Sequence, residues 1–599
     1  MYISTLKLWN FRKYGSLDPF DISKPSLLVN LNKGLNILIG ENDSGKTAII
    51  DAIKLVLKTH AYEWIKVEES DFFTQGRDTT ETLRIEIEFA GISNREAANF
   101  TEWCGWSDET NDDGKKIKRP KLFLYYQATF KDGKIFPSDV RAGMDGHGNL
   151  LTAEAKEYLK CTYLKALRDA DSELAARKNS RLSQILREHQ EFKTKEPSGL
   201  HEFEELFDKT SKTIQNKFAQ DGLSYNTNIK KVVDDFISAF IGSGSESSFD
   251  LGATRINSIL EKISLGIIDA SNLGLGTMNR LFMAAELLHL KKVNWNGLKL
   301  CMIEELEAHL HPQAQLKIIN RLKQEKDLQY ILTTHSPNIT SQADLADVII
   351  CKNVNVYSLG QGYTKLDNPN YKYLRRFLDV TKSSLFFSKG NIIVEGWSEE
   401  ILLPVLAKKM GYDLTKQEIS IVNVASTAYL HFAKIFLRSD GTKMNVPVSI
   451  ITDFDNRPNE DGVFKALKDE SKEVQKKQQN IEKLKSDLAG TDVTLEIAKE
   501  WTLEWCLFKS CLSELFKDAL STVHSKTDEF KKEKGHYKAA FQGKFIKKLS
   551  KQDGTSPIDK VALVNELAEI LDNDTTITQE QIIADSYLQY IVNAIKHVC

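Results

Sequence analysis

The sequence has no paired-cysteine motif, no long apolar run and no large excess of charge. Its seven cysteines are an odd number, lie scattered and include no C-x-x-C pair, which favours reduced thiols over a disulfide framework. No run approaches the roughly 18 apolar residues of a membrane-spanning helix. The first residues, MYISTLKLWNFRKYG, lack the continuous apolar segment of a signal peptide. We therefore expect a soluble, cytoplasmic protein with no membrane partner.

The net charge of −3 over 599 residues excludes a chain that is basic throughout. Any surface for nucleic acid must then be a local basic patch that acidic residues offset elsewhere. A chain of this length holds several domains. Its 41% hydrophobic and 27% charged residues are ordinary for globular domains.

The first informative motif is a P-loop between a strand and a helix. Residues 35–39 predict a strand, GENDSGKT follows, and AIIDAIKLVLK has helical spacing. This is G-x-x-x-x-G-K-[ST] in the context that binds nucleotide phosphates. Loop N–H groups surround phosphate oxygens, the lysine reaches the β- and γ-phosphates and the threonine holds Mg²⁺. We predict that ATP is bound by Gly40, Asn42, Ser44, Gly45, Lys46 and Thr47.

Two later strands also end in residues suited to an ATP site. The apolar run 298–303 ends at Glu304 and Glu305, and QYILTT ends at His335. The first glutamate would support Mg²⁺, the second would activate the attacking water, and the histidine would contact the γ-phosphate. Paired glutamates alone are common at helix starts, and a single histidine is more often structural. Their order after a P-loop favours ATP binding.

Together, the P-loop, EELEAHLHP and TTHSP resemble the split ATPase head of the ABC type shared by SMC and RecF-like proteins. That resemblance implies a signature loop that binds the γ-phosphate held by a second subunit, and therefore at least a homodimer. SNLGLGTMNRLFMAAELL stands at the family's position for this loop, without the usual serine-bearing signature. Gly274 and Gly276 precede a helix whose N-terminus can face an anion. An ordinary helix start fits the same stretch.

Residues 151–248 predict a helical insertion between these pieces. Apolar residues recur there at helical spacing among many Lys, Glu and Ala, so the helices are expected to pack on each other or on a second subunit. A solvated helical insertion fits the pattern equally well. Arg168, Lys178 and Arg181 could contact a DNA backbone, although charge on an exposed helix is usually only solvated.

Two strands in the second half end in acidic residues. NIIVEGWSEE puts Glu395 at a strand end and Glu399 in the first turn of a helix, and VPVSIITDFDNRP carries Asp453 and Asp455. Residues i and i+2 of a strand point to the same side, so we expect the aspartates to converge and to need a cation or a proton. Carboxylates at a rigid strand–helix junction suit Mg²⁺. A single acidic helix start has an ordinary explanation.

A strand ending E-G, a helix, a strand, a helix and a strand ending D-x-D resembles the TOPRIM module. The T-L-E around Glu504 and the lysine of PIDKVALVNELAEIL, Lys560, resemble elements of the overcoming-lysogenization-defect (OLD) nucleases. That family includes Gabija-type and retron-associated anti-phage defence nucleases. Lys544, in QGKFIKKL, is the alternative lysine.

The resemblance implies an α/β chain with an ABC/SMC-like ATPase head, a helical insertion and a TOPRIM (Rossmann-like) nuclease domain. The two parts of the ATPase are expected at 1–150 and 249–380. The insertion, a candidate dimerisation element, is expected at 151–248. The nuclease domain is expected at 385–599, with a helical insertion at 460–490.

The same resemblance implies an ATP-regulated DNA endonuclease that uses two divalent ions, Mg²⁺ or Mn²⁺. The implied metal ligands are Glu395, Glu399, Asp453, Asp455 and Glu504, with Thr47 on the magnesium of ATP. The implied catalytic residues are Glu395, Asp453, Asp455 and Lys560, with Glu305 for ATP hydrolysis. Expected partners are DNA, further copies of the chain, and in some systems a helicase or a retron reverse transcriptase with its DNA. The alternative is an SMC/RecF-like DNA-binding ATPase whose TOPRIM module does not cut.

Overall fold

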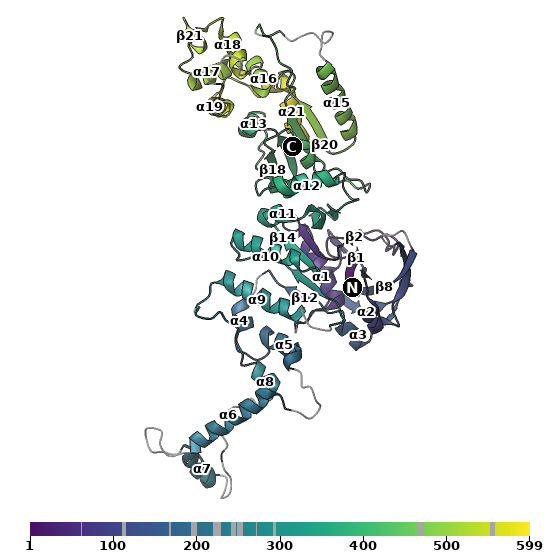
Figure 1. The fold of residues 1–599 in the computed structure, drawn as a ribbon. Helices are drawn as coiled ribbons and strands as arrows, with labels where there is room; N and C mark the ends of the chain where they lie inside the picture. The colour runs from purple at the N-terminus through teal and green to yellow at the C-terminus, as the bar shows by residue number, and fades with distance from the viewer. Residues whose placement is uncertain are drawn as a thin grey trace. The chain divides into compact units, whose positions relative to one another are not determined.

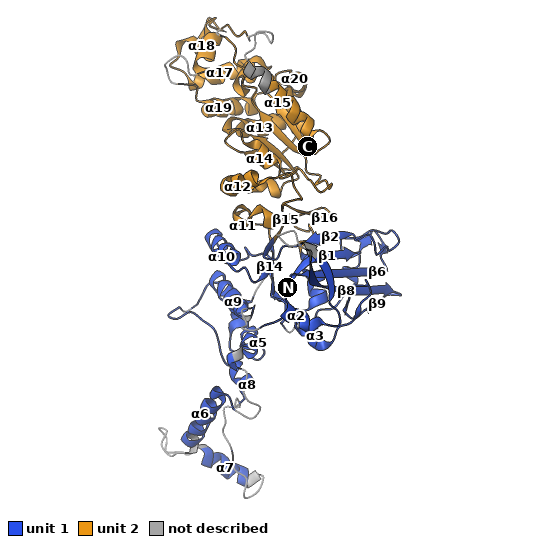
Figure 2. Cartoon of the chain, turned by 45° about the vertical axis from the view of Figure 1, so that its right-hand side comes forward, with its two compact units in different colours: residues 1–36, 47–333 blue, residues 37–46, 334–599 orange. Residues whose placement is uncertain are grey.

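The computed structural model (Figure 1) divides into two compact units, coloured separately in Figure 2. Unit 1 comprises Met1–Asn36 and Thr47–Thr333, and unit 2 comprises Ile37–Lys46 and Thr334–Cys599. The structure describes every residue except 62, 111–115, 167–168, 193–199, 220–228, 241–246, 248–254, 271, 291–294, 460, 464–471 and 551–556. The domain boundaries expected from the sequence remain a prediction.

An antiparallel sheet contains most N-terminal residues of unit 1. Its order is β11 (Asn149–Leu150), β10 (Arg141–Ala142), β8 (Lys116–Lys131), β6 (Thr82–Ala90), β1 (Tyr2–Trp9) and β2 (Leu27–Asn30). β7 (Gly105–Thr110) and β9 (Lys134–Pro137) also pair with β8. Leu6 and Leu8 of β1 are buried, because alternate side chains of a strand point to one face. Ile3 is buried as well, beyond the register shift between Ile3 and Thr5.

Unit 1 also contains parallel strands that hold the acidic motif. β12 (Thr162–Leu164), β13 (Leu300–Ile303) and β14 (Gln329–Thr334) pair in parallel. All of β13 is buried, and Glu304 follows it directly, so the predicted strand end is confirmed. The sequence predicted a helix where β12 lies. That prediction was wrong, because a β-branched and an aromatic residue, Thr162 and Tyr163, favour a strand against β13.

Helices fill most of the described part of the predicted insertion. They are α3 (Ala153–Glu157), α4 (Ala170–Leu174), α5 (Arg181–Glu188), α6 (Glu202–Ala219) and α7 (Ile229–Phe240), followed by α8 (Ile256–Leu260) and α9 (Leu275–Leu290). α4 and α5 pack against α9, and α6 packs against α7 and α8. Unit 1 also holds α1 (Lys46–Leu57) except its first residue, α2 (Asn94–Ala97), α10 (Pro312–Gln324), β4 (Thr74–Gln75) and β5 (Asp78–Thr79).

Arg181 lies in the interior of unit 1. It is 5% exposed, and its Nε and Nη2 donate to the two carboxylate oxygens of Glu286 on α9 at 2.6 and 2.9 Å. The prediction that Arg181 contacts DNA was therefore wrong. Lys178 is exposed, and Arg168 lies outside the described residues.

A four-stranded parallel sheet organises most of unit 2. Its order is β18 (Ile419–Asn423), β17 (Gly390–Val394), β19 (Val448–Thr452) and β20 (Val493–Ile497), and both central strands are fully buried. The helices that contact its strands include α13 (Trp397–Lys409), α14 (Tyr429–Ala433) and α21 (Gln589–Val598) (Figure 1). α19 (Lys560–Asn573) packs on α13, and α17 (Ser513–Val523) packs on α19 and on α16 (Leu503–Lys509). α21 packs on β17, β19 and β20, and Ser449 Oγ donates to the Ala594 carbonyl at 3.0 Å.

The remaining elements of unit 2 are shorter or more peripheral. α15 (Lys472–Leu488) forms the described part of the helical insertion predicted at 460–490, and it packs on β20. The others are β3 (Leu35–Ile39, in part), β15 (Val348–Lys352), β16 (Asn355–Ser358), β21 (Lys532–Glu533), β22 (His536–Tyr537), α11 (Pro337–Gln342), α12 (Asn368–Phe377), α18 (Phe541–Leu549) and α20 (Gln579–Ala584). Among the described residues, none of the helices has the length and apolar character that crossing a bilayer requires.

The buried Arg181–Glu286 pair makes the attachment of α5 to α9 sensitive to single substitutions. Arg181→Met leaves Glu286 charged and unpaired in the interior, which should lower the free energy of unfolding by about 3–5 kcal/mol. Arg181→Met combined with Glu286→Met should recover most of that loss. Urea unfolding of the three proteins measures both effects.

The exposed pair Arg177–Glu173, at 3.0 Å, provides the control. Arg177→Met should cost less than about 1 kcal/mol, because water screens exposed ion pairs. Equal losses for the two arginines would contradict the structural role of the buried pair.

Candidate functional site

The P-loop of unit 2 follows a fully buried strand and needs glycine at its first position. β3 pairs in parallel with β15, with Ile37 opposite Val348. Gly40 has φ +150°, and a Cβ there would stand 2.3 Å from the Cys351 carbonyl oxygen. Gly45 has φ +98°, in the left-handed region that glycine tolerates without strain. The sequence of the loop is thus dictated by its backbone.

Lys46 lies inside this loop. Its Nζ donates to the carbonyls of Gly40 and Glu41 at 2.9 and 2.6 Å and to Ser44 Oγ at 3.1 Å, and the residue is 5% exposed. The ammonium group can exchange these oxygens for phosphate oxygens. The loop also contains Asn42, and His335 stands half-buried just before α11.

Glu304, the first acid predicted for the ATP site, belongs to unit 1. Glu304 is 8% exposed, and Tyr163 Oη donates to its Oε2 at 2.6 Å. Burial raises the pKa of Glu304, while hydrogen bonds from Tyr163 and Thr47 oppose that rise. Lys54 Nζ lies 3.8 Å from the centre of the Tyr163 ring. Thr47 and Glu304, two predicted ATP-site residues, are thus in contact.

Glu305 has a strained backbone. Its φ is +43°, a conformation that costs a non-glycine residue free energy and is common at functional sites. Its N–H donates to Thr333 Oγ1 at 3.0 Å, which holds this turn against β14.

One of the two signature glycines has a different position from the one predicted. Gly274 precedes α9, but Gly276 lies within its first turn. A Cβ on Gly276 would stand 2.5 Å from the His309 carbonyl oxygen. Gly276 therefore allows α9 to pack closely on the segment after Glu305.

Acidic residues gather at the carboxyl end of the parallel sheet in unit 2. β17 and β19 are neighbours, with Ile393 opposite Ile450, so Glu395 and Asp453 leave adjacent strand ends. Thr452 Oγ1 donates to Glu395 Oε1. The Leu503 N–H donates to Asp453 Oδ1 at 2.9 Å, which fixes the start of α16 beside the sheet.

Two further acids and one lysine complete the group. Glu399 lies in the first turn of α13, and Glu504 lies in the first turn of α16. Glu504 is 1% exposed, and Lys560 Nζ, at the start of α19, donates to its Oε2 at 2.8 Å. The alternative lysine, Lys544, lies 3.9 Å from Glu529 instead. We call Glu395, Glu399, Asp453, Glu504 and Lys560 the acidic cluster.

The carboxylates of the acidic cluster repel one another. Burial and then the charges of Glu504 and Glu399 hold the pKa of Asp453 well above its usual range. Burial and Glu504 also raise the pKa of Glu399. Although burial alone would lower it, the pKa of Lys560 is raised, because Glu504 stabilises the ammonium. One lysine cannot balance four carboxylates, so the donor set fits divalent cations.

The carboxylates lie within electrostatic reach of one another rather than in a closed coordination shell. Across the part of the chain that the structure describes, no three His, Cys, Asp or Glu side chains form a metal-binding group. An ion bound here would therefore draw the side chains inward.

Asp455 does not follow strand alternation as predicted. β19 ends at Thr452, and Asp455 has φ +54° with its N–H donating to the Trp501 carbonyl at 2.7 Å. The i, i+2 argument therefore does not apply beyond the strand. Burial, and then the charges of Glu395 and Asp455, raise the pKa of Tyr429, so both carboxylates lie within electrostatic reach of its hydroxyl group.

Sequence reasoning missed three hydroxyl groups. Tyr163 was hidden in a stretch predicted as helical. Thr452 and Tyr429 were not predicted as site residues. The position of Thr452 at the end of an apolar strand, directly before Asp453, could have indicated its role. All three orient or influence carboxylates of the two sites.

Comparison with known families yields two matches. A model described as an AAA ATPase domain matches residues 1–142 and 146–340. A model described as the TOPRIM domain of overcoming lysogenization defect-like proteins matches residues 386–455. The two matches cover the P-loop with the Glu304 motif, and the strands that lead to Glu395 and Asp453, respectively.

Three curated proteins are similar to this chain. Endonuclease GajA of Bacillus cereus is 22% identical over 551 residues, covering 77% of this chain and 78% of that protein. The OLD nuclease of Thermus scotoductus is 21% identical over 492 residues, covering 75% and 84%. The Retron Ec83 probable ATPase of Escherichia coli is 29% identical over 149 residues, covering 23% and 27%.

Removing the Tyr163 hydroxyl should weaken magnesium-dependent ATP binding. Tyr163→Phe takes a hydrogen bond from the Glu304 carboxylate and so raises the pKa of that group further. We expect about tenfold weaker Mg²⁺ affinity in the presence of ATP, since a charge-assisted hydrogen bond contributes about 1.5 kcal/mol. The loss should shrink as the pH rises, because Glu304 then ionises fully; Mg²⁺ titrations across pH measure both effects.

Tyr330→Phe on β14 is the matched control. Within the described residues the buried hydroxyl of Tyr330 has no hydrogen-bond partner, so its removal should leave Mg²⁺ affinity unchanged. Identical behaviour of the two variants would contradict the role of Tyr163.

The crowded acids should destabilise the metal-free protein. A raised pKa of Glu399 means that the folded state binds the proton more tightly than the unfolded chain, so stability is lost as the pH rises through that range. Near pH 8 without divalent ions, Glu399→Gln should therefore raise the melting midpoint by roughly 2–4 °C, as about 1 kcal/mol does in a domain of this size. Thermal melts across pH test this.

Added Mg²⁺ should reverse the order. Wild type should gain more stability than Glu399→Gln, because the variant has lost a ligand. Glu569→Gln, on the exposed face of α19, should match wild type throughout. A lower melting midpoint for metal-free Glu399→Gln would refute the electrostatic account.

Proposed function

This chain belongs to the OLD family of AAA ATPases with a TOPRIM nuclease domain, and we propose that it is an ATP-regulated, metal-dependent endonuclease that cuts DNA. The observation that carries the proposal is the acidic cluster, with four carboxylates and one lysine at the carboxyl end of a parallel sheet. In open α/β sheets, ligands bind beyond these strand ends. The similarity to two proteins named as nucleases supports the same conclusion.

In this proposal Glu395, Glu399, Asp453, Asp455 and Glu504 hold two divalent ions, Mg²⁺ or Mn²⁺. When bound, such ions activate a water and stabilise the leaving 3′-oxygen of a phosphodiester. The chain's own contribution is orientation. Thr452 fixes one oxygen of Glu395, and the Leu503 N–H fixes one oxygen of Asp453.

Lys560 supplies the positive charge of the site. Its hydrogen bond to the deeply buried Glu504 holds the ammonium at the edge of the acids, and the raised pKa keeps it protonated at neutral pH. From there it neutralises charge that develops on the scissile phosphate. Asp453 and Asp455 complete the proposed catalytic set with Glu395.

ATP acts as the control input in this proposal. The loop residues Gly40, Asn42, Ser44, Gly45 and Lys46, with His335, contact the phosphates. Thr47 and Glu304, already in contact, hold the ATP magnesium, and Glu305 orients the attacking water. Gly274 and Gly276 bind the γ-phosphate held by a second copy, so we infer a homodimer or higher oligomer.

The family resemblance extends the proposal to anti-phage defence. The substrate is DNA, held chiefly through its phosphates and therefore sensitive to salt. The similarity to a retron ATPase over part of the chain supports a system in which the nuclease works beside other components, such as a helicase or a retron reverse transcriptase with its DNA.

Plasmid cleavage tests the nuclease activity directly. Purified protein with Mg²⁺ or Mn²⁺ should cut supercoiled plasmid, and Asp453→Asn or Lys560→Met should lower the rate at least 100-fold, because each removes charge required in the transition state. Gel analysis of time courses measures the rates. Asp453→Asn keeps an oxygen that can accept from the Leu503 N–H, so the fold is preserved.

Lys544→Met is the matched control for Lys560→Met, because Lys544 faces Glu529 instead of Glu504, and it should leave cleavage unchanged. Plasmid that stays intact under all metal conditions, while the protein still binds DNA and hydrolyses ATP, would favour the SMC/RecF-like alternative.

A further inference from the structure

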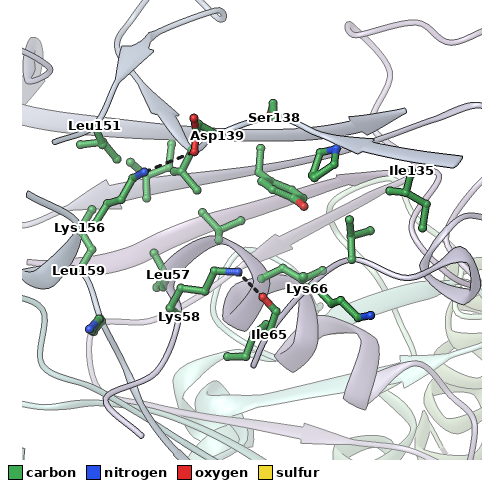
Figure 3. Close-up of a pocket in the computed structure, with 18 residues that line it drawn as sticks. Leu57, Lys58, Ile65, Lys66, Ile135, Ser138, Asp139, Leu151, Lys156 and Leu159 are labelled. Carbon is green, nitrogen blue, oxygen red and sulfur yellow. Dashed lines mark hydrogen bonds and ion pairs between the residues drawn. The ribbon is translucent and has the colours of Figure 1, made fainter. Parts of the chain in front are cut away.

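A cavity of about 440 Å³ opens in unit 1, and none of its lining residues belongs to either proposed site (Figure 3). Its volume lies within the roughly 300–1,000 Å³ of small-molecule sites. It is bounded by the C-terminal turn of α1, by the segment 65–67, by strands β8 and β9, and by the region from 137 to 160. Every lining residue belongs to unit 1.

The floor of the cavity is apolar. Leu55, Val56, Leu124, Val140 and Leu159 line it and are each at most 8% exposed. Leu151 and Ile135 contribute further aliphatic surface. This surface favours a hydrocarbon body, because removing apolar area from water stabilises the complex by about 25 cal/mol per Å².

The rim of the cavity is cationic. Four lysines line it, Lys58, Lys66, Lys156 and Lys160, against one acid, Asp139. Lys156 Nζ lies 3.8 Å from Asp139, and Lys160 pairs with Glu157 at 2.6 Å. Lys58 Nζ donates to the Ile65 carbonyl at 2.8 Å. Figure 3 shows the Lys58 and Lys156 ammonium groups on the wall of the cavity.

The lysines repel one another. Partial burial, and then the charge of Lys156, lower the pKa of Lys58. An anion beside these two ammonium groups would relieve both effects, since an opposite charge at short range favours the charged form. The rim therefore complements a negative group, and the floor complements an apolar one.

We propose that this cavity binds a small amphipathic anion, with one aliphatic body in the apolar floor and one carboxylate or phosphate against Lys58 and Lys156. The ligand would rest on the last turn of α1, the helix whose first residues, Lys46 and Thr47, belong to the ATP-binding loop. This proposal does not depend on the proposed nuclease function, and the experiments below test it independently.

Trp64 provides a reporter for binding. It is 90% exposed and directly precedes the lining residues Ile65 and Lys66. Dodecanoate, used below its micelle concentration, should bind the full-length protein at one site per chain by calorimetry and change tryptophan fluorescence. Dodecanol should bind at least tenfold more weakly, and dodecyltrimethylammonium should not bind, because only the anionic head complements the rim.

Charge reversal on the rim separates this site from general surface binding. Lys156→Glu should weaken dodecanoate binding at least tenfold while leaving dodecanol binding unchanged. Lys134→Glu, an exposed residue of β9 that does not line the cavity, should bind like wild type. Val140→Phe, which fills the floor, should weaken both ligands.

Binding of dodecanoate that is no tighter than that of dodecyltrimethylammonium, or that is unaffected by Lys156→Glu, would overturn the proposal. Because Lys156 is a surface residue in an exposed pair with Asp139, its charge reversal leaves the fold intact and the result interpretable. Dodecyl phosphate compared with dodecanoate then distinguishes a phosphate head from a carboxylate head.

Discussion

Negative charge is concentrated at one end of the parallel sheet in unit 2, and the elements around it have to stabilise that charge. Three helices begin at this end, α13, α16 and α19, and each brings a residue of the acidic cluster in its first turn. Helix N-termini carry unpaired N–H groups and a partial positive charge, so they offset part of the repulsion among the carboxylates. Lys560 offsets a further part of this repulsion. The repulsion that remains favours the binding of cations.

Apolar packing elsewhere in unit 2 fixes the positions of the helices and strands that carry these carboxylates. Glu504 is almost fully buried at the start of α16, where Trp505 and Phe508 of the same helix pack on each other and on Phe545, and α21 packs on the central strands. A site whose ligands repel each other can persist only where apolar packing stabilises the surrounding helices. The aromatic core is thus as necessary to the chemistry as the carboxylates.

The sequence predicted best the apolar strands that end in a candidate functional residue. The runs before Glu304, Glu395 and Asp453 became fully buried strands, as short runs of apolar or β-branched residues indicate. Local spacing carried this information. Local spacing does not indicate which distant side chain contacts a carboxylate, so the sequence did not predict the contact of Tyr163 with Glu304. Tyr163 itself was predicted to lie in a helix.

The predictions for Arg181 and Asp455 were both wrong because each extended a local sequence pattern to a feature that local spacing does not determine. Arg181 had the appearance of a surface charge because its partner, Glu286, lies 105 positions further along the chain. Asp455 was expected to point with Asp453 because strand alternation was extended past Thr452, where a left-handed residue breaks it. By contrast, the choice between Lys560 and Lys544, open at the level of sequence, depends on a single tertiary contact with Glu504.

The acidic cluster draws its members from segments spread along the chain from Glu395 to Lys560, on a sheet that α21 covers last. On the ribosome, Glu395, Glu399 and Asp453 therefore emerge well before Glu504 and Lys560. The complete cluster therefore cannot form before the segment with Lys560 has left the exit tunnel, whereas the P-loop and the Glu304 motif emerge much earlier. Translation order alone thus delays the acidic cluster until the P-loop and the Glu304 motif have been made.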